Sequence, residues 1–257
     1  AEFPVINGEK GQFSLLLDVP AGNSGKAQLK SFQSGLRFNM VPREAVAEIT
    51  VPDKEQVTSE FGQFIENNPV TGKVEETMDG LKLTVIGKAA HGMEPEKGIN
   101  AGTYLATFLN KYDFAGGAAS FISFLAKYLH LDTRMEKFDC SFTDDVMGEL
   151  TMNAGILNYD EENGGKINMN FRYPKGITPD EIQAKVEKIT KSLAITVNQG
   201  DGQLPHYVDP DDPIVKTLME AYIDISGDQN AKPEVVGGGT YGRLMKRGVA
   251  FGALMPN

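Results

Sequence analysis

The chain has 257 residues, 40% hydrophobic and 23% charged, which is typical of a folded globular protein and argues against a disordered one. Its formal net charge of −10 argues against a nucleic-acid partner or an anionic membrane surface, because phosphate groups would be repelled. The single cysteine excludes an internal disulfide and a four-cysteine zinc site. No apolar run reaches the roughly 20 residues of a membrane-spanning helix, and residues 1–10 lack the pattern of a secretory signal. The single cysteine suits a reducing cytoplasm, which is where we expect the protein.

The first half of the chain combines strand and helix signals. Alternation of apolar and polar residues predicts strands, and apolar residues spaced three and four apart predict helices. These signals predict strands at 12–19, 27–38 and 44–51, a helix at 53–68, a hairpin at 73–89, and helices at 100–111 and 117–130. Asp79-Gly80 is the expected turn of the hairpin, and Asn100 or Thr103 is the expected cap of the helix that follows it.

The second half repeats this order of strands and helix. Strand-like flanks around a turn predict a hairpin at 148–174, and an amphipathic helix is expected at 177–194 with Thr178 as its N-cap. The stretches 47–65 and 169–189 each read as a strand, a proline-containing turn, an acidic helix start and a helix. This faint repeat predicts two related α+β units packed into one domain.

The last part of the chain differs in character. Gly, Asp and Pro residues cluster at 199–213, as they do in connections. Beyond this cluster we expect a helix at 214–227, then a strand end, a glycine turn and a helix over 233–248, and a buried strand at 249–257. This α/β tail is too short to form an independent parallel sheet, so we expect it to pack against a larger domain.

Two side chains in the predicted loops and strand ends are candidates for binding. His91 follows a strand and precedes a helix, in the kind of loop that often carries binding residues, although a lone loop histidine is more often solvated. Arg172 lies between Phe171 and Tyr173, so its side chain faces away from the aromatic pair. An arginine fixed at a strand end can hold a carboxylate through two parallel hydrogen bonds, and the alternative is a solvated strand arginine.

A run of glycines near the end of the chain is the third candidate. Three glycines at 237–239 would let a ligand approach the backbone, and the N–H groups opening the next helix could hold an anion, although a plain helix-entry turn is the alternative. His130 and His206 lack the spacing of a zinc site. Adjacent carboxylates at 144–145, 161–162 and 211–212 are typical of solvated turns rather than of metal sites.

Four segments taken together resemble a known family. These segments are "EFPVINGEKG", "GKAAHGMEPEKGINA", "FRYP" and "GGGTYGR", and they occur in the order found in the M20 metallopeptidases, especially the bacterial PepV-type dipeptidases that cleave Xaa-His and other dipeptides. The resemblance covers the whole chain. It implies an α+β protein in which residues 8–205 form a lid of two related ferredoxin-like α/β units, while 1–7 and 206–257 are pieces of an α/β catalytic domain.

The resemblance also implies roles for individual residues. His91 matches a lid histidine that stabilises the oxyanion of the tetrahedral intermediate. Arg172 matches the arginine that binds the C-terminal carboxylate of a dipeptide substrate, and Asn39 matches a lid asparagine that hydrogen-bonds the substrate. The same end of the substrate would be held by a glycine loop made of Gly237, Gly238, Gly239 and Thr240.

The ligands of the two zinc ions in this family have no match in the chain. The family uses a His-x-Asp pair, a bridging aspartate, a Glu-Glu pair, a further aspartate and a late histidine, so the resemblance implies that the chain is a middle piece of the enzyme and is inactive alone. The parent enzyme is expected to be a monomer. Two alternatives stay open: a binding or dimerisation module without chemistry, and an M20 amidohydrolase acting on N-acyl amino acids.

Overall fold

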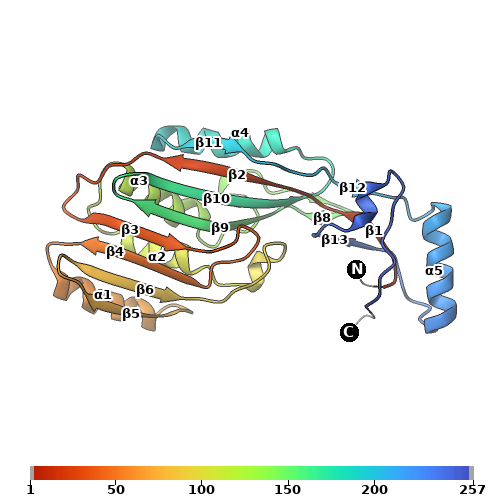
Figure 1. Ribbon diagram of the computed structural model, residues 1–257, viewed down its shortest axis with the longest axis horizontal. Helices are drawn as coiled ribbons and strands as arrows, with labels where there is room; N and C mark the ends of the chain where they lie inside the picture. The colour runs from red at the N-terminus through yellow and green to blue at the C-terminus, as the bar shows by residue number, and fades with distance from the viewer. Residues whose placement is uncertain (1–2, 255–257) are drawn as a thin grey trace.

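The computed structural model describes residues 3–254. Its largest unit is an antiparallel sheet covered by helices on one face (Figure 1). The eight strands lie in the order β11-β2-β10-β9-β3-β4-β6-β5. Their bounds are β2 Gly11–Val19, β3 Gln28–Ser34, β4 Glu44–Thr50, β5 Thr71–Glu76, β6 Leu81–Ile86, β9 Thr151–Asp160, β10 Gly164–Tyr173 and β11 Thr196–Gln199. The helices are α1 Lys54–Glu66, α2 Ala101–Leu109, α3 Gly117–Phe124 and α4 Pro179–Thr190.

The large sheet consists of two four-stranded units joined edge to edge through β9 and β3. Strands β2, β9, β10 and β11, with helices α3 and α4, follow the chain order βαββαβ, and the third strand of this unit lies between the first two, which is the ferredoxin-like arrangement. The second unit has the same spatial order, but its outer strand β3 comes first in the chain. This second unit is inserted between β2 and α3 of the first. The α+β fold with two ferredoxin-like units is therefore as predicted.

Local sequence signals fix the helix starts. The Asp53 side chain accepts a hydrogen bond from Gln56 N at the start of α1, and Asn100, one of the two caps expected for α2, accepts one from Thr103 N. At α4 the predicted N-cap Thr178 forms a complete capping box with Glu181. Each cap satisfies backbone N–H groups that would otherwise lack partners where a strand turns into a helix.

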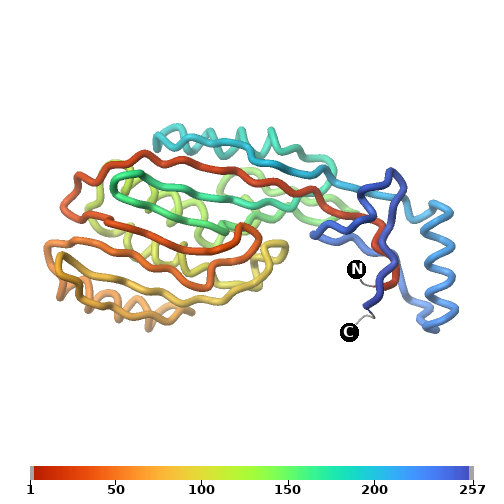
Figure 2. Tube along the Cα trace, in the orientation of Figure 1, coloured from red at the N-terminus to blue at the C-terminus, as the bar shows by residue number. Residues whose placement is uncertain are grey.

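A second, smaller sheet lies at one end of the molecule, beside helix α5 (Pro213–Ser226) (Figure 1). It has the order β12-β1-β13, with β1 Ile6–Glu9, β12 His206–Tyr207 and β13 Glu234–Val236. A separate small core of Val5, Val208, Val215 and Met219 supports it. The trace in Figure 2 shows the chain passing from the small sheet into β2 and returning after β11. The boundary expected after residue 7 falls within β1, which continues to Glu9.

Short elements complete the described chain. They are the hairpin of β7 (Thr143–Asp144) and β8 (Gly148–Glu149), the 3-10 turns Pro95–Lys97, Glu136–Phe138, Lys191–Leu193 and Tyr241–Leu244, and the π-helical turn Leu125–Leu129 that ends the helix expected to reach residue 130. No helix among residues 3–254 has both the length and the apolar character needed to cross a bilayer.

Two expectations about the C-terminal part are wrong. The helix expected after the glycine turn is only the 3-10 turn Tyr241–Leu244, in which Thr240 caps the backbone N–H of Gly242. The strand expected at 249–257 does not form a continuous ladder among the described residues: Ala250 pairs with Ile6 in an isolated bridge, and the Leu254 carbonyl accepts from Phe3 N. Phe251 and Leu254 are 41% and 61% exposed, so the apolar run lacks the neighbouring strands that would bury it. Residues 255–257 of that prediction lie outside the described residues.

Candidate functional site

His91 lies on an exposed turn in the loop between β6 and α2. The backbone N–H of Met93 donates to His91 Nδ1 over 3.2 Å, so Nδ1 is the acceptor and the neutral ring carries its proton on Nε2. Partial burial lowers the pKa of His91, and the positive charge of Arg172 lowers it further, against a smaller opposing effect of Glu94. The imidazole is therefore neutral at pH 7, with an N–H directed away from its own loop's backbone.

Asn39 lies directly beside this turn. Its carbonyl accepts a hydrogen bond of 2.7 Å from Gly92 N, and the neighbouring Met40 pairs with His91 in an antiparallel bridge. A Cβ at Gly92 would lie 3.0 Å from the Asn39 backbone, so only glycine fits this approach without displacement. The 38–40 segment is held by the buried Asn153, whose Nδ2 donates to the carbonyls on both sides of Asn39 over 2.8 and 3.0 Å. Asn39 and His91 thus form one fixed unit.

Arg172 is buried near the end of β10 and is 4% exposed, so it is not a solvated strand arginine. Its aromatic neighbours Phe171 and Tyr173 are buried in the core on the opposite face of the strand. Nη1 donates to the side-chain oxygen of Gln12 on β2, while Nε has no hydrogen-bond partner among residues 3–254. Burial lowers the pKa of Arg172, and the charge of Arg243 lowers it further. A buried cation with an unused donor is unfavourable unless an anion pairs with it.

The glycine loop approaches the His91 turn from the small sheet. A Cβ at Gly237 would lie 3.0 Å from the Cβ of Met93, whereas a Cβ at Gly238 would meet nothing within 4 Å. Gly237 therefore lies next to the turn, whereas a Cβ at Gly239 would lie 3.5 Å from Arg243 Nε and 3.6 Å from Gln203 Oε1. Thr240 is bonded within the protein: its N–H donates to Glu9 Oε2 over 2.9 Å and its hydroxyl donates to Glu9 Oε1. Both polar groups of Thr240 are engaged within the protein.

A polar network that the sequence did not reveal connects the two sheets. Glu9, 1% exposed, pairs with Arg243 at 2.6 Å between Oε2 and Nε. Arg243 also donates to the side-chain oxygen of Gln203, which accepts a further hydrogen bond of 2.8 Å from Gln12. Gln12 in turn accepts from Arg172. These hydrogen bonds connect the glycine loop to Arg172, the candidate residue for binding a carboxylate, which we call the carboxylate clamp. Glu9 and Arg243 lie within the "VINGEKG" and "GGGTYGR" segments, and membership of these segments was the only feature of the sequence that pointed to the two residues.

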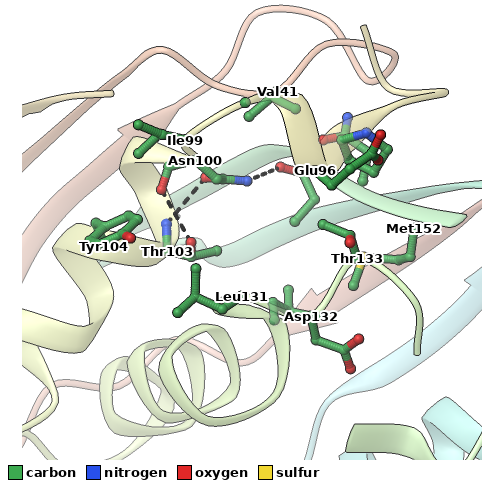
Figure 3. Close-up of a pocket in the computed structure, with 15 residues that line it drawn as sticks. Val41, Glu96, Ile99, Asn100, Thr103, Tyr104, Leu131, Asp132, Thr133 and Met152 are labelled. Carbon is green, nitrogen blue, oxygen red and sulfur yellow. Dashed lines mark hydrogen bonds between the residues drawn. The ribbon is translucent and has the colours of Figure 1, made fainter. Parts of the chain in front are cut away.

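A pocket of about 290 Å³ lies behind the loop that carries His91 (Figure 3). The loop supplies one wall with Glu96 and Ile99, and α2 supplies another with Thr103 and Tyr104. Asn100, at the end of the loop, is fixed to α2 and to β9, because its Oδ1 accepts from Thr103 N and its Nδ2 donates to the Ala154 carbonyl over 2.9 Å. The His91 loop therefore contributes one wall of the pocket, and the contacts of Asn100 hold the end of this loop in place.

His130 lies beside this pocket, and its surroundings allow a prediction about the stability of the protein. Its ring lies edge-on to Tyr104 at 4.6 Å, and Nδ1 lies 3.3 Å from Thr103 Oγ1. Burial, with a smaller effect of the Lys137 charge, lowers the pKa of His130 to about 4. The unfolded chain therefore binds this proton more readily. The contribution of His130 to the free energy of unfolding is fully present above about pH 6.5 and is lost as the pH drops through 4, by about 1 to 2 kcal/mol once solvent screening of the half-buried ring is allowed for.

The His130 prediction is checked by urea unfolding of the wild type and of His130→Gln between pH 4 and 7. We expect the variant to show a shallower fall of the unfolding free energy with decreasing pH. Equal slopes for the two proteins would contradict the assignment. Because the comparison is one of slopes, any constant loss of stability in the variant does not affect it.

Zinc does not fit the residues that the structure describes. Among residues 3–254, no group of three or more His, Cys, Asp or Glu side chains comes together in a way that could hold a metal ion. His91, Asn39 and Arg172 are instead two hydrogen-bonding groups and a cation, and they suit an anionic, polar substrate. The site can hold a carboxylate and donate a hydrogen bond to a second oxygen.

The chain is similar over nearly its whole length to proteins that each carry the name "Putative dipeptidase". It is 40% identical to one from Staphylococcus saprophyticus and 40% identical to one from Staphylococcus epidermidis, in both cases over 99% of this chain and 55% of the relative. The chain thus spans about half the length of the curated relatives it matches. No protein-family model matches it. A crystal structure of aminoacylhistidine dipeptidase from Vibrio alginolyticus aligns with 91% of this chain and 51% of its own, at 14% identity and a TM-score of 0.40.

Proposed function

We propose that this chain forms the substrate-binding side of a dipeptidase of the M20 type, close to the PepV-like enzymes. The observation that carries the proposal is the buried Arg172 guanidinium, which has an unused Nε donor and lies near enough to His91 to lower its pKa. An enzyme that recognises a short peptide by its free carboxylate needs such a cation beside the group that stabilises the reacting carbonyl. The names of the relatives support the same activity.

Each residue has a distinct role in this proposal. Arg172 binds the C-terminal carboxylate, and His91 donates from Nε2 to the oxyanion that develops on the scissile carbonyl. Asn39 and the backbone of Gly237 to Gly239 hydrogen-bond the substrate. Because a fixed clamp at the carboxylate limits how far away the scissile carbonyl can lie, longer peptides are rejected. Thr240 holds the glycine loop through Glu9 rather than contacting the substrate.

The wider setting of the chain is part of the proposal. Residues 8–205 would act as a lid, and 1–7 with 206–257 would belong to a catalytic domain that includes further sequence. The zinc ions would be bound by that further sequence, because the described residues offer no ligand group. We propose a cytoplasmic and monomeric parent enzyme, and we expect the isolated 257-residue chain to be inactive.

The experiment is a substrate panel on the full-length protein that contains this chain, with elemental analysis of bound metal. We expect bound zinc, turnover of free dipeptides, and at least about 100-fold lower kcat/KM for tripeptides and for dipeptides with an amidated C-terminus. Faster turnover of N-acyl amino acids would instead support the amidohydrolase. Binding of dipeptides without hydrolysis would support a module that carries no chemistry.

A further inference from the structure

The carboxylate clamp is connected to the small sheet by a short series of side-chain hydrogen bonds. Arg243, in the 3-10 turn that follows the glycine loop, donates from Nη1 to Gln203 Oε1. Gln12 Nε2 donates to the same oxygen over 2.8 Å, and Gln12 Oε1 accepts from Arg172 Nη1. Gln12 and Arg172 lie on β2 and β10 of the large sheet, whereas Gln203 lies in the segment between β11 and β12. The hydrogen bonds therefore cross the junction of the two sheets.

The two arginines fix the orientation of both glutamine amides. A guanidinium can only donate, so the atom of Gln203 that faces Arg243 must be its oxygen. The atom of Gln12 that faces this oxygen must then be its nitrogen, which leaves the Gln12 oxygen toward Arg172. Turning either amide over would place donor against donor. Because both arginines require the same arrangement, only one arrangement satisfies all the hydrogen bonds.

Arg243 is a fixed end of this series. Its side chain is 9% exposed, its Nε pairs with Glu9 Oε2 at 2.6 Å, and its Nη2 donates to the Lys10 carbonyl over 3.0 Å. All three of its nitrogen atoms are thus engaged within the protein. Glu9 also accepts from the N–H and the hydroxyl of Thr240. One buried carboxylate therefore anchors both the glycine loop and the hydrogen bonds that lead to Arg172.

Arg172 depends on Gln12 for its orientation. Its hydrogen bond to Gln12 is the only one that its side chain makes among residues 3–254, and no carboxylate in this part of the chain pairs with it. Arg243 differs, because Glu9 neutralises it. The planar guanidinium of Arg172 presents its remaining donors in a fixed direction only while Gln12 holds one of them.

We propose that Gln203 and Arg243 are positioning residues for Arg172, because they hold Gln12 and thereby keep the guanidinium turned toward the substrate carboxylate. The proposal rests on the proposed function, since it uses Arg172 as the carboxylate clamp. Recognition of the carboxylate then depends on residues outside the sheet that carries the clamp. The glycine loop and the clamp, which hold the same end of the substrate, are set in place by the same anchor.

Gln203→Met tests the proposal, because it keeps the length of an exposed side chain and removes its amide. In the full-length protein we expect kcat/KM for a dipeptide with a free C-terminus to fall about tenfold, mainly through a higher KM, as loss of a hydrogen bond to a charged group would give. The value for the same dipeptide with an amidated C-terminus should stay within about twofold of the wild type, because that substrate has no carboxylate for Arg172.

Two further variants separate the amide from its position in the chain. Gln203→Glu keeps an acceptor for both Arg243 and Gln12, so its kcat/KM should stay within about threefold of the wild type. Gln199→Met is the matched control, because it replaces an exposed glutamine at the end of β11, and it should stay within about twofold. A Gln203→Glu variant as impaired as Gln203→Met, or an equal loss for the free and the amidated dipeptide, would overturn the proposal.

A double-mutant cycle and a crystal structure complete the test. Gln203→Met should cost less than about twofold in an Arg172→Met background, because the residue through which Gln203 acts is then absent. A tenfold loss in both backgrounds would overturn the positioning role, whereas an Arg172→Met variant with undiminished turnover would count against the proposed function. The crystal structure of Gln203→Met reports positioning without turnover: we expect Gln12 and the Arg172 guanidinium to move, and unchanged positions of both would contradict the proposal.

Discussion

His91→Ala in the full-length protein is expected to lower kcat by about 100- to 1000-fold, with a much smaller change in KM. The loss is of this size because a preorganised donor to an oxyanion acts mainly in the transition state. The structure supplies the geometry for such a donor, since Met93 N occupies Nδ1 and leaves the proton on Nε2. Steady-state kinetics with a free dipeptide makes the measurement.

The control for His91 lies on the same loop. Glu94→Gln removes an exposed carboxylate that pairs with Lys97, and it should leave kcat within about twofold of the wild type. If His91→Ala also stayed within about twofold, the oxyanion role would be untenable. A large rise in KM with unchanged kcat would equally contradict it, because that result indicates uniform binding of substrate and transition state.

Arg172→Met should lower kcat/KM for dipeptides by about 100- to 1000-fold, since truncating one partner of a buried charge pair costs about 2 to 5 kcal/mol. The fold should survive this change, because the arginine is buried with an unused Nε and methionine removes a charge that no carboxylate among residues 3–254 pairs with. Kinetics is measured with matched dipeptides that carry a free or an amidated C-terminus.

The amidated substrate separates a carboxylate clamp from a merely structural arginine. The wild type should discriminate strongly against the amide, and Arg172→Met should process both substrates at similar low rates. Lys166→Met is the control, because it removes an exposed cation, with 76% of its side chain accessible, from the same face of the same strand. Undiminished discrimination in Arg172→Met would show that another group reads the carboxylate.

Local chemistry made much of the fold predictable from the sequence. The hairpin turn at Asp79-Gly80 and the capping box at Thr178 depend on neighbouring residues, and both were predicted. The insertion of one unit within the other was not, because β2 pairs with β10 about 150 residues later in the chain. The faint sequence repeat matched β4 and α1 to β10 and α4. These strands are not equivalent, because β4 lies second and β10 third in the spatial order of its own four-stranded unit.

The candidate site was also predictable from the sequence only in part. Short motifs predicted His91, Asn39 and Arg172 as candidate residues. The structure brings His91 together with Asn39, and the charge of Arg172 lowers the pKa of His91. Glu9 and Arg243 were missed because a buried pair between residues so far apart has no local pattern. The alternation of Asn168, Asn170 and Arg172 was visible in the sequence, but only the structure shows that the two asparagines line a pocket.

The central claim is that Arg172 and His91 act on one small substrate, Arg172 on its C-terminal carboxylate and His91 on its scissile carbonyl. A crystal structure of the full-length protein with a phosphinic dipeptide analogue, which imitates the tetrahedral intermediate, tests it most directly. We expect the analogue's carboxylate on Arg172 Nε and a phosphinate oxygen on His91 Nε2, each at about 3 Å. An analogue bound with Nε still unpaired, or with the imidazole beyond hydrogen-bond reach of the phosphinate, would contradict the account.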